Sequence, residues 1–213
     1  MTFATKLASV SSVATGAVGT GVGGAYYSSL ETIESKLKGK ILGNYENFKS
    51  TWDHKHDQLK KESGVLSEDL KGIKDGKGIS LYCQKNYSST YKSIFSKKGN
   101  DSLLKETEKW CTQTFKDQLS VGIGSNGKVL DVDSETTDAD EFKTNYKKLK
   151  DHKITEGKLP KNLQDLAPKA SEESESKWKL LQSYCKEIQK KYLTAETLED
   201  FKVAKKYCIK AGT

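Results

Sequence analysis

Apolar side chains recur every three or four positions from residue 30 onward, which is the periodicity of one face of an α-helix. Over residues 30–59 this stripe consists of Leu30, Ile33, Leu37, Ile41, Tyr45, Phe48, Trp52 and Leu59. The pattern predicts one long amphipathic helix. Gly39 and Gly43 lie within it, and because each weakens a helix by about 1 kcal/mol relative to alanine, we expect a bend there. The helix would either form a stalk or pack against later helices.

Two further stretches of helical periodicity each contain two of the four cysteines, and each cysteine follows an aromatic residue. The apolar positions of the first stretch are Ile79, Tyr82, Cys83, Tyr87, Thr90, Tyr91, Ile94 and Phe95, then Leu103, Leu104, Thr107, Trp110, Cys111, Thr114 and Phe115. Those of the second are Trp178, Leu181, Tyr184, Cys185, Ile188 and Tyr192, then Leu198, Phe201, Ala204, Tyr207 and Cys208. Residues 97–101 and Thr194 are suited to end one helix or cap the next. Each stretch therefore predicts a helical hairpin.

The positions of the cysteines favour one disulfide within each hairpin. Residues of two antiparallel helices lie side by side when they are equidistant from the turn. The sequence midpoint of Cys83 and Cys111 is residue 97, inside the first expected turn, and that of Cys185 and Cys208 falls close to the second. In the chain-entropy model each closed loop would contribute about 3.5 kcal/mol. The alternative is four buried free thiols, since free cysteine packs well as a small apolar residue.

The segments between the hairpins predict smaller elements. Residues 66–73 suggest a short helix, and the glycines of residues 74–78 a turn. The short alternating runs 119–123 and 128–132 flank Asn126-Gly127, which is a strong signal for a β-hairpin. An acidic stretch then precedes a helix that contains Phe142, Tyr146 and Leu149, where negative charge suits the helix dipole. Residues 153–177, with two prolines and a polar, acidic end, are interpreted as a connector.

Neither of the two groups of metal-ligating residues matches a known metal site. His54 and His56 are two positions apart, so on a helix they point to different sides, and no Cys-x-x-Cys is present for zinc. Calcium is the other candidate, because the EF-hand loop places acids at alternate positions, as the chain does from Asp131. That register lacks the glycine at position six and has Phe142 where a bidentate glutamate belongs. We therefore expect no metal and no cofactor.

Residues 7–27 contain no charged side chain and are long enough to cross a bilayer as a helix. Gly19 and Gly23 form a small-xxx-small pair that would let two such helices approach closely. Tyr26 and Tyr27 lie where interfacial aromatic residues are expected. The segment is interpreted as a retained membrane anchor, with a cleaved export signal and a flexible glycine-rich leader as alternatives.

Composition narrows the function classes further. The formal net charge is +7 and all basic residues are lysine, interleaved with acids. Because base recognition favours the planar fork of arginine, we do not expect nucleic-acid binding. Motifs such as Gly-x-Ser-x-Gly are absent from the sequence, and His152 stands in a charged run where we expect it to be solvated. The sequence thus contains no recognisable catalytic constellation.

The leader Ala4-Thr5-Lys6-Leu7-Ala8, its Gly/Ala/Val continuation, the lysine-rich body and the late Tyr-Cys and Trp-Cys pairs occur together. This layout resembles the uncharacterised paralogous protein families of haemotropic mycoplasmas, the cell-wall-less bacteria that attach to red blood cells. The resemblance implies a membrane-anchored or exported surface protein of unknown activity, and it implies no functional residues.

These patterns predict a mainly α fold with an N-terminal small-residue-rich helix, a long amphipathic helix, two disulfide-stapled helical hairpins and one small β-hairpin. The expected units are an anchor or signal-like segment (1–29), an amphipathic helical region (30–78), the first cysteine-paired hairpin with the β-hairpin (79–152), the connector (153–177) and the second cysteine-paired hairpin (178–213).

The expected function is a membrane-anchored, surface-exposed helical interaction or antigen protein without catalysis, whose bulk lies outside the cell. Its partners would be the membrane and a host or cell-surface macromolecule, with self-association as a further option. The alternatives are a secreted or anchored enzyme and a cytosolic basic module that binds nucleic acid.

Overall fold

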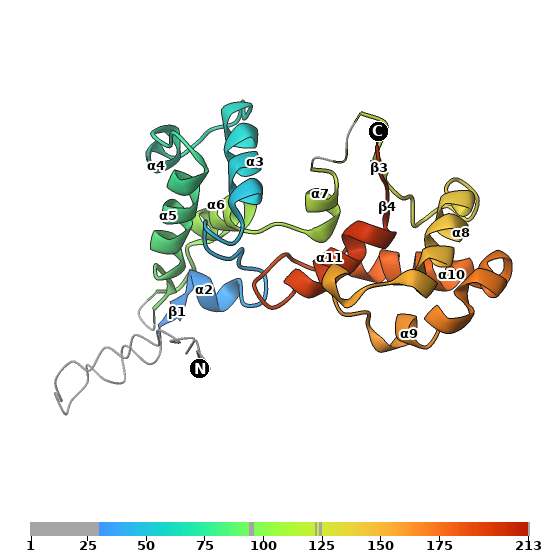
Figure 1. The fold of residues 1–213 in the computed structure, drawn as a ribbon. Helices are drawn as coiled ribbons and strands as arrows, with labels where there is room; N and C mark the ends of the chain where they lie inside the picture. Colours follow the sequence, from blue (N-terminus) through green and yellow to red (C-terminus); the bar gives the residue numbers. More distant parts are fainter. Residues whose placement is uncertain (1–29, 94–95, 122, 124, 213) are drawn as a thin grey trace, which may run out of the picture.

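A computed structural model describes residues 30–93, 96–121, 123 and 125–212 of the chain. It is mainly helical, with two disulfides and two small two-stranded antiparallel sheets, which confirms the mainly α class and the cross-links. Figure 1 shows two groups of helices side by side. We call residues 30–111 the first lobe and residues 115–212 the second lobe; residues 112–114 connect them.

The first lobe is built around helix α5, which packs against α3 and α6 and carries α4 on its side. Its elements are β1 (Glu31–Thr32), α2 (Ile33–Lys36), α3 (Lys49–Lys60), α4 (Glu68–Lys71), α5 (Gly76–Tyr87), β2 (Thr90–Lys92) and α6 (Asp101–Cys111). The strands β1 and β2 pair antiparallel beside α2.

The second lobe is built around α10, its longest helix, which packs against α8 and α11. Its elements are α7 (Phe115–Leu119), β3 (Lys128–Val129), α8 (Ala139–Lys147), η1 (Lys148–Asp151), η2 (Ile154–Glu156), α9 (Lys161–Gln164), η3 (Ala167–Lys169), α10 (Ala170–Ile188), α11 (Leu198–Tyr207) and β4 (Ile209–Lys210). Helix α8 follows the first cysteine pair in the sequence, but it lies against α10 (Figure 1).

The prediction of one long helix over residues 30–59 is wrong. Helix α2 ends at Lys36, Gly39 adopts a φ of +75°, and α3 begins only at Lys49. A left-handed residue stops a helix, and glycine is the residue that adopts this conformation without strain. The apolar side chains are nevertheless buried, since Leu37, Phe48 and other members of the stripe lie in the interior. The stripe predicted burial correctly, but the segment is not a stalk.

The first helix of the first hairpin is shorter than predicted. Helix α5 ends at Tyr87, and Thr90–Lys92 is instead strand β2, paired with β1. Positions 94 and 95 lie outside the described residues. The predicted start of the return helix is right, because the Asn100 side chain accepts a hydrogen bond from the Leu103 N–H at 3.2 Å. That helix ends at Cys111, so Thr114 and Phe115 do not belong to it; Thr114 caps α7.

The β-hairpin predicted over residues 119–132 is also wrong. Leu119 is the last residue of α7, and Lys128–Val129 pairs with Ile209–Lys210, which lies just after α11. Two strands joined by a tight turn are marginal without further support. Strand β3 finds that support in a partner held beside it by α11, which no local pattern could have indicated. The structure therefore contains two small sheets in place of one hairpin.

The second hairpin begins earlier than predicted, and the loop between its two helices is longer. The polar residues 171–176, interpreted as part of the connector, form the first turns of α10, where Ala170 and Ser174 are buried. Helix α10 ends at Ile188, so Tyr192 lies in the following loop. Helix α11 starts after Thr197, three residues beyond the predicted cap at Thr194.

A single hydrophobic core cluster runs through both lobes. Between them, the chain from Cys111 to Phe115 lies between two loops: Ile41 forms a β-bridge with Thr112, and Thr114 forms one with Tyr192. None of the helices within the described ranges combines the length and the apolar character that a bilayer span requires. The expected anchor at residues 7–27 lies outside those ranges.

Candidate functional site

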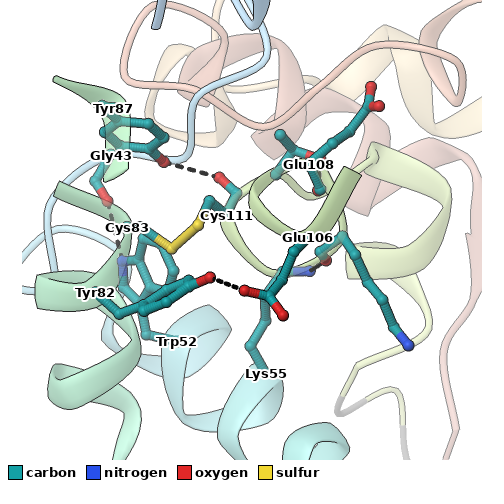
Figure 2. The surroundings of a disulfide bond; sticks show 11 residues. Gly43, Trp52, Lys55, Tyr82, Cys83, Tyr87, Glu106, Glu108 and Cys111 are labelled. Atoms are coloured by element: carbon teal, nitrogen blue, oxygen red, sulfur yellow. Dashed lines mark hydrogen bonds between the residues drawn. A yellow bond between two sulfur atoms is a disulfide. The ribbon is translucent and has the colours of Figure 1, made fainter. Parts of the chain in front are cut away.

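The four cysteines form two buried disulfides, and the first lies at the centre of the first lobe. Cys83 in α5 is bonded to Cys111 at the end of α6, with a Cα–Cα distance of 5.5 Å and no exposure of either residue. Figure 2 shows the polar ends of nearby aromatic side chains directed at backbone carbonyls. Trp52 Nε1 donates to the Gly43 carbonyl at 2.9 Å, and Tyr87 Oη donates to the Cys111 carbonyl at 3.0 Å. The first bond ties the start of α3 to the loop that precedes it, and the second ties the end of α5 to the end of α6 beside the cross-link.

A buried lysine lies one turn after Trp52 on the same face of α3. Lys55 is 4% exposed and donates from Nζ to the Lys109 carbonyl in the last turn of α6, at 3.1 Å (Figure 2). A cation is favourable at a helix C-terminus, but burial lowers the pKa of Lys55 to about 8, against a weaker opposing effect of Asp117. Perturbed lysines can act as nucleophiles or bases. This one lines none of the five best-formed hollows of the described residues, and its bond to the Lys109 carbonyl favours a structural role.

The second disulfide joins α10 to the end of α11 with the same geometry. Cys185 and Cys208 are fully buried, and their Cα atoms are 5.5 Å apart. Next to the cross-link, Asn145 in α8 donates from Nδ2 to the Tyr207 carbonyl at 3.1 Å and to the Ile209 carbonyl at 3.0 Å. One amide side chain thereby connects α8 to both the end of α11 and strand β4.

The expectation that His152 is solvated is wrong. Its side chain is 7% exposed, Nδ1 lies 2.8 Å from Tyr207 Oη, and Nε2 lies 2.8 Å from the Gly157 carbonyl. Nothing in the sequence indicated this burial, because the charged neighbours Asp151 and Lys153 are both exposed, and only the ring between them points inward. Both ring nitrogens are occupied, so His152 holds the segment after η1 against α11 and is poorly placed for proton transfer.

The acidic stretch contributes one buried carboxylate. Asp138 accepts from the Asp131 N–H at 2.7 Å and pairs with Lys128 at 2.5 Å. Burial opposes ionisation, but these two partners outweigh it and hold the pKa of Asp138 below its usual range. Across the described ranges there is no cluster of three or more His, Cys, Asp or Glu residues that could hold a metal ion. His54 and His56 are part-exposed on α3.

The junction of the lobes contains two hollows. The larger, of about 540 Å³, lies between the loop that follows α2 and residues 194–196, and its lining mixes apolar atoms with Glu34, Lys38 and Glu196. The second, of about 320 Å³, lies between α3 and α11 and is lined mainly by apolar side chains: Phe48, Leu119, Val121, Leu193, Leu198 and Phe201. Both hollows are lined by residues of the first and the second lobe.

The remaining predicted site residues cannot be placed. Tyr26 and Tyr27, expected at the membrane interface, and Gly19 and Gly23, expected at a helix-packing face, lie outside the described residues. The two disulfides indicate an extracellular or otherwise oxidising location.

No family model matches the chain, and neither a curated protein nor a solved structure matches it at a significant level.

Several buried polar residues were not recognised from the sequence. Lys55 lies three positions after Trp52 and four before Leu59, so a lysine on the apolar stripe of α3 was the available signal. Asn145 similarly lies next to Tyr146 and three positions after Phe142, on the buried side of α8. In both helices the polar residue on the apolar face is the one that makes a contact between helices.

Proposed function

We propose that this chain is a membrane-anchored, surface-exposed helical interaction or antigen protein without a catalytic role. Residues 7–27 would provide the anchor, and the two lobes would lie outside the cell. The observation that carries the proposal is the pair of buried disulfides, one in the centre of each lobe. Such bonds persist in oxidising compartments and are rare where thiols are kept reduced.

The arrangement of titratable groups favours binding over catalysis. His152 is the main candidate for a catalytic histidine. Both of its ring nitrogens are engaged, one by Tyr207 and the other by Gly157. Carboxylates such as Glu175 and Asp133 form exposed ion pairs with lysines, which is the ordinary role of such residues on helix surfaces. Lysines engaged in this way also contribute less to phosphate attraction, so nucleic-acid binding remains the weaker alternative.

Protease treatment of intact cells tests the proposal. We expect added protease to remove the lobes from intact cells and to leave a short membrane-associated fragment that contains residues 7–27. A cytosolic protein in the same cells serves as the control for lysis. A chain that stays protected until the cells are lysed would contradict surface display.

Alkylation before lysis tests the oxidation state independently. We expect no cysteine to be alkylated without reductant and all four to be alkylated after reduction, as read from the mass of the intact chain. Alkylation of all four cysteines without reductant would rule out the disulfides in the cell and, with them, the oxidising location.

A further inference from the structure

The two lobes begin with the same kind of capped helix. At the start of α2 the Thr32 side chain accepts a hydrogen bond from the Ser35 N–H at 3.2 Å. At the start of α7 the Thr114 side chain accepts one from the Asp117 N–H at 3.1 Å. Five positions after each threonine stands a leucine that is 1% exposed, Leu37 in the first lobe and Leu119 in the second. A polar cap and a buried residue therefore recur at one spacing.

Both of these helices are attached to the loop that follows the first cysteine of their lobe. The Ile33 N–H donates to the Ser89 carbonyl at 3.0 Å. The Phe115 N–H donates to the Lys191 carbonyl at 2.8 Å. Each acceptor lies six positions after the cysteine. The antiparallel pairs beside these bonds also correspond: Thr32 with Thr90, and Thr114 with Tyr192. The same backbone contact thus holds the capped helix in each lobe.

A backbone pairing next to the disulfide closes the first lobe. Thr112 follows Cys111 directly and forms an antiparallel β-bridge with Ile41. The neighbouring Leu42, which is buried, donates from its N–H to the Cys111 carbonyl at 3.2 Å. The end of α6 is thereby attached to the segment that precedes α3.

The second lobe is closed in the same way. Ile209 follows Cys208 directly and pairs with Val129 in the sheet of β3 and β4 (Figure 1). The buried Leu130 donates from its N–H to the Cys208 carbonyl at 3.0 Å. The two closing segments are also similar in sequence, with Lys-Ile-Leu at residues 40–42 and Lys-Val-Leu at residues 128–130.

The helix after the closing segment carries buried residues at the same spacing in both lobes. They are Trp52, Lys55 and Leu59 in α3, and Phe142, Asn145 and Leu149 in α8 and η1. The middle position is polar in both, and its side chain donates to a carbonyl in the last turn of the second cysteine-bearing helix: Lys55 to Lys109, and Asn145 to Tyr207. Two different side chains therefore make one kind of contact at one position.

The lengths of the connecting segments differ, whereas the spacing within the elements does not. The second lobe has a longer chain between residues 119 and 130 than the first has between 37 and 42, and a longer one between 149 and 185 than between 59 and 83. Such insertions are tolerated in connections. A disulfide between two helices requires neither a capping threonine nor the two attached backbone pairings, so the shared order of these features indicates a common origin.

We propose that residues 32–112 and 114–209 are two copies of one folding unit, joined in tandem by Gln113. The unit consists of a capped short helix, a closing segment, a helix with a buried polar residue, a second short helix (α4 or α9) and two helices linked by a disulfide. The proposal goes beyond the interaction function given above and does not depend on it, because it concerns the scaffold. It predicts that equivalent segments can replace one another.

Exchange of one segment in the full-length, oxidised chain tests this prediction. In the matched variant, residues 32–37 are replaced by the sequence of residues 114–119, which keeps the capping threonine and the final leucine. In the shifted control they are replaced by the sequence of residues 115–120, which puts a lysine at buried position 33 and a serine at buried position 37. We expect both disulfides to form in the matched variant, and its urea midpoint to fall less than half as far as that of the control.

Two further measurements keep the test decisive. If the larger phenylalanine at position 33 prevents folding, the reciprocal exchange of residues 32–37 into 114–119, with residues 33–38 as its shifted control, gives the same comparison. In the wild-type chain, NMR scalar couplings across the hydrogen bonds should join Leu42 to Cys111 and Leu130 to Cys208. A matched exchange as harmful as the shifted one in both directions would overturn the proposal, and so would couplings in one lobe without their counterparts in the other.

Discussion

The two lobes use the same cross-link but satisfy their buried polar groups differently. In each, a disulfide with a Cα–Cα distance of 5.5 Å ties a long helix to the end of a later helix. In the second lobe the buried amide of Asn145 and the ring of His152 are fully engaged, and the unpartnered buried atoms of its described residues lie on Gln118, Tyr146 and Tyr184.

The described residues of the first lobe have the same number of unpartnered buried atoms, which lie on Ser67, Asn86 and Thr107. The first lobe differs in that it also contains the buried ammonium of Lys55. Such groups reduce stability, and natural proteins commonly retain them where a function requires them. The comparison leads us to expect that the first lobe is the less stable of the two, because it contains the buried charge of Lys55.

The largest expected effect comes from removing the disulfides one at a time. The bonded cysteines are separated by 28 residues in the first lobe and by 23 in the second, so the chain-entropy model gives each a nearly equal contribution of about 3.5 kcal/mol. Any larger difference in stability between the two disulfide variants must therefore come from the packing of the lobes. We expect the variant Cys83→Ala/Cys111→Ala to unfold its own lobe at lower urea than Cys185→Ala/Cys208→Ala unfolds the second.

Hydrogen exchange read by mass spectrometry resolves the two lobes in this comparison. In the first variant, loss of protection should be confined to residues 30–111 at moderate urea. Equal loss of protection in both lobes of both variants would show that the single core cluster unfolds as one unit and that the contrast drawn between the lobes is wrong.

The second effect concerns Lys55 and depends on pH. Its pKa is lowered from 10.5 to about 8 in the folded chain, so between these values the unfolded state binds more protons and stability rises with pH. Below pH 8 the buried charge is therefore unfavourable, by up to about 3 kcal/mol. We expect Lys55→Met to raise the free energy of unfolding at pH 7. The gain should be smaller than the cost of the buried charge, because the substitution also removes the hydrogen bond to the Lys109 carbonyl.

Urea unfolding at several pH values checks this prediction. The advantage of Lys55→Met should shrink as the pH rises from 8 towards 10.5, because the wild type gains stability there. Lys60→Met, which makes the same change at an exposed position of α3, should not alter the pH profile. A difference between Lys55→Met and wild type that is independent of pH would show that the lysine is not a buried charge.

The smallest of the three effects tests the support in the second lobe. Asn145→Ala leaves the Tyr207 and Ile209 carbonyls without their donor, and we expect a loss of about 2 kcal/mol in the free energy of unfolding. Asn162→Ala at an exposed position of α9 is the control and should change stability by less than about 0.5 kcal/mol. Equal effects of the two substitutions would mean that Asn145 does not tie α8 to β4.

Local patterns identified buried residues more reliably than they identified elements. The stripe over residues 30–59 included Ile33, Leu37, Phe48 and Trp52, all of which are buried, although the segment is not one helix. Hydrophobic periodicity reports which side chains avoid water, and a turn such as that at Gly39 can preserve the burial while ending the helix. The hollows at the junction of the lobes were not predicted, because their residues come from separate segments of the chain.

The sequence by itself determined the mainly helical class and most of the buried apolar positions, and it favoured the observed pairing of the cysteines, since periodicity and distance from a turn are local properties. Only the tertiary structure decided the partner of β3, the inward position of His152 and the contacts of Lys55 and Asn145. Each of these depends on a group that is distant in sequence: strand β4 at Ile209, the Tyr207 hydroxyl or the Lys109 carbonyl. A hydrogen-bonding partner of that kind is specified only when the helices have packed.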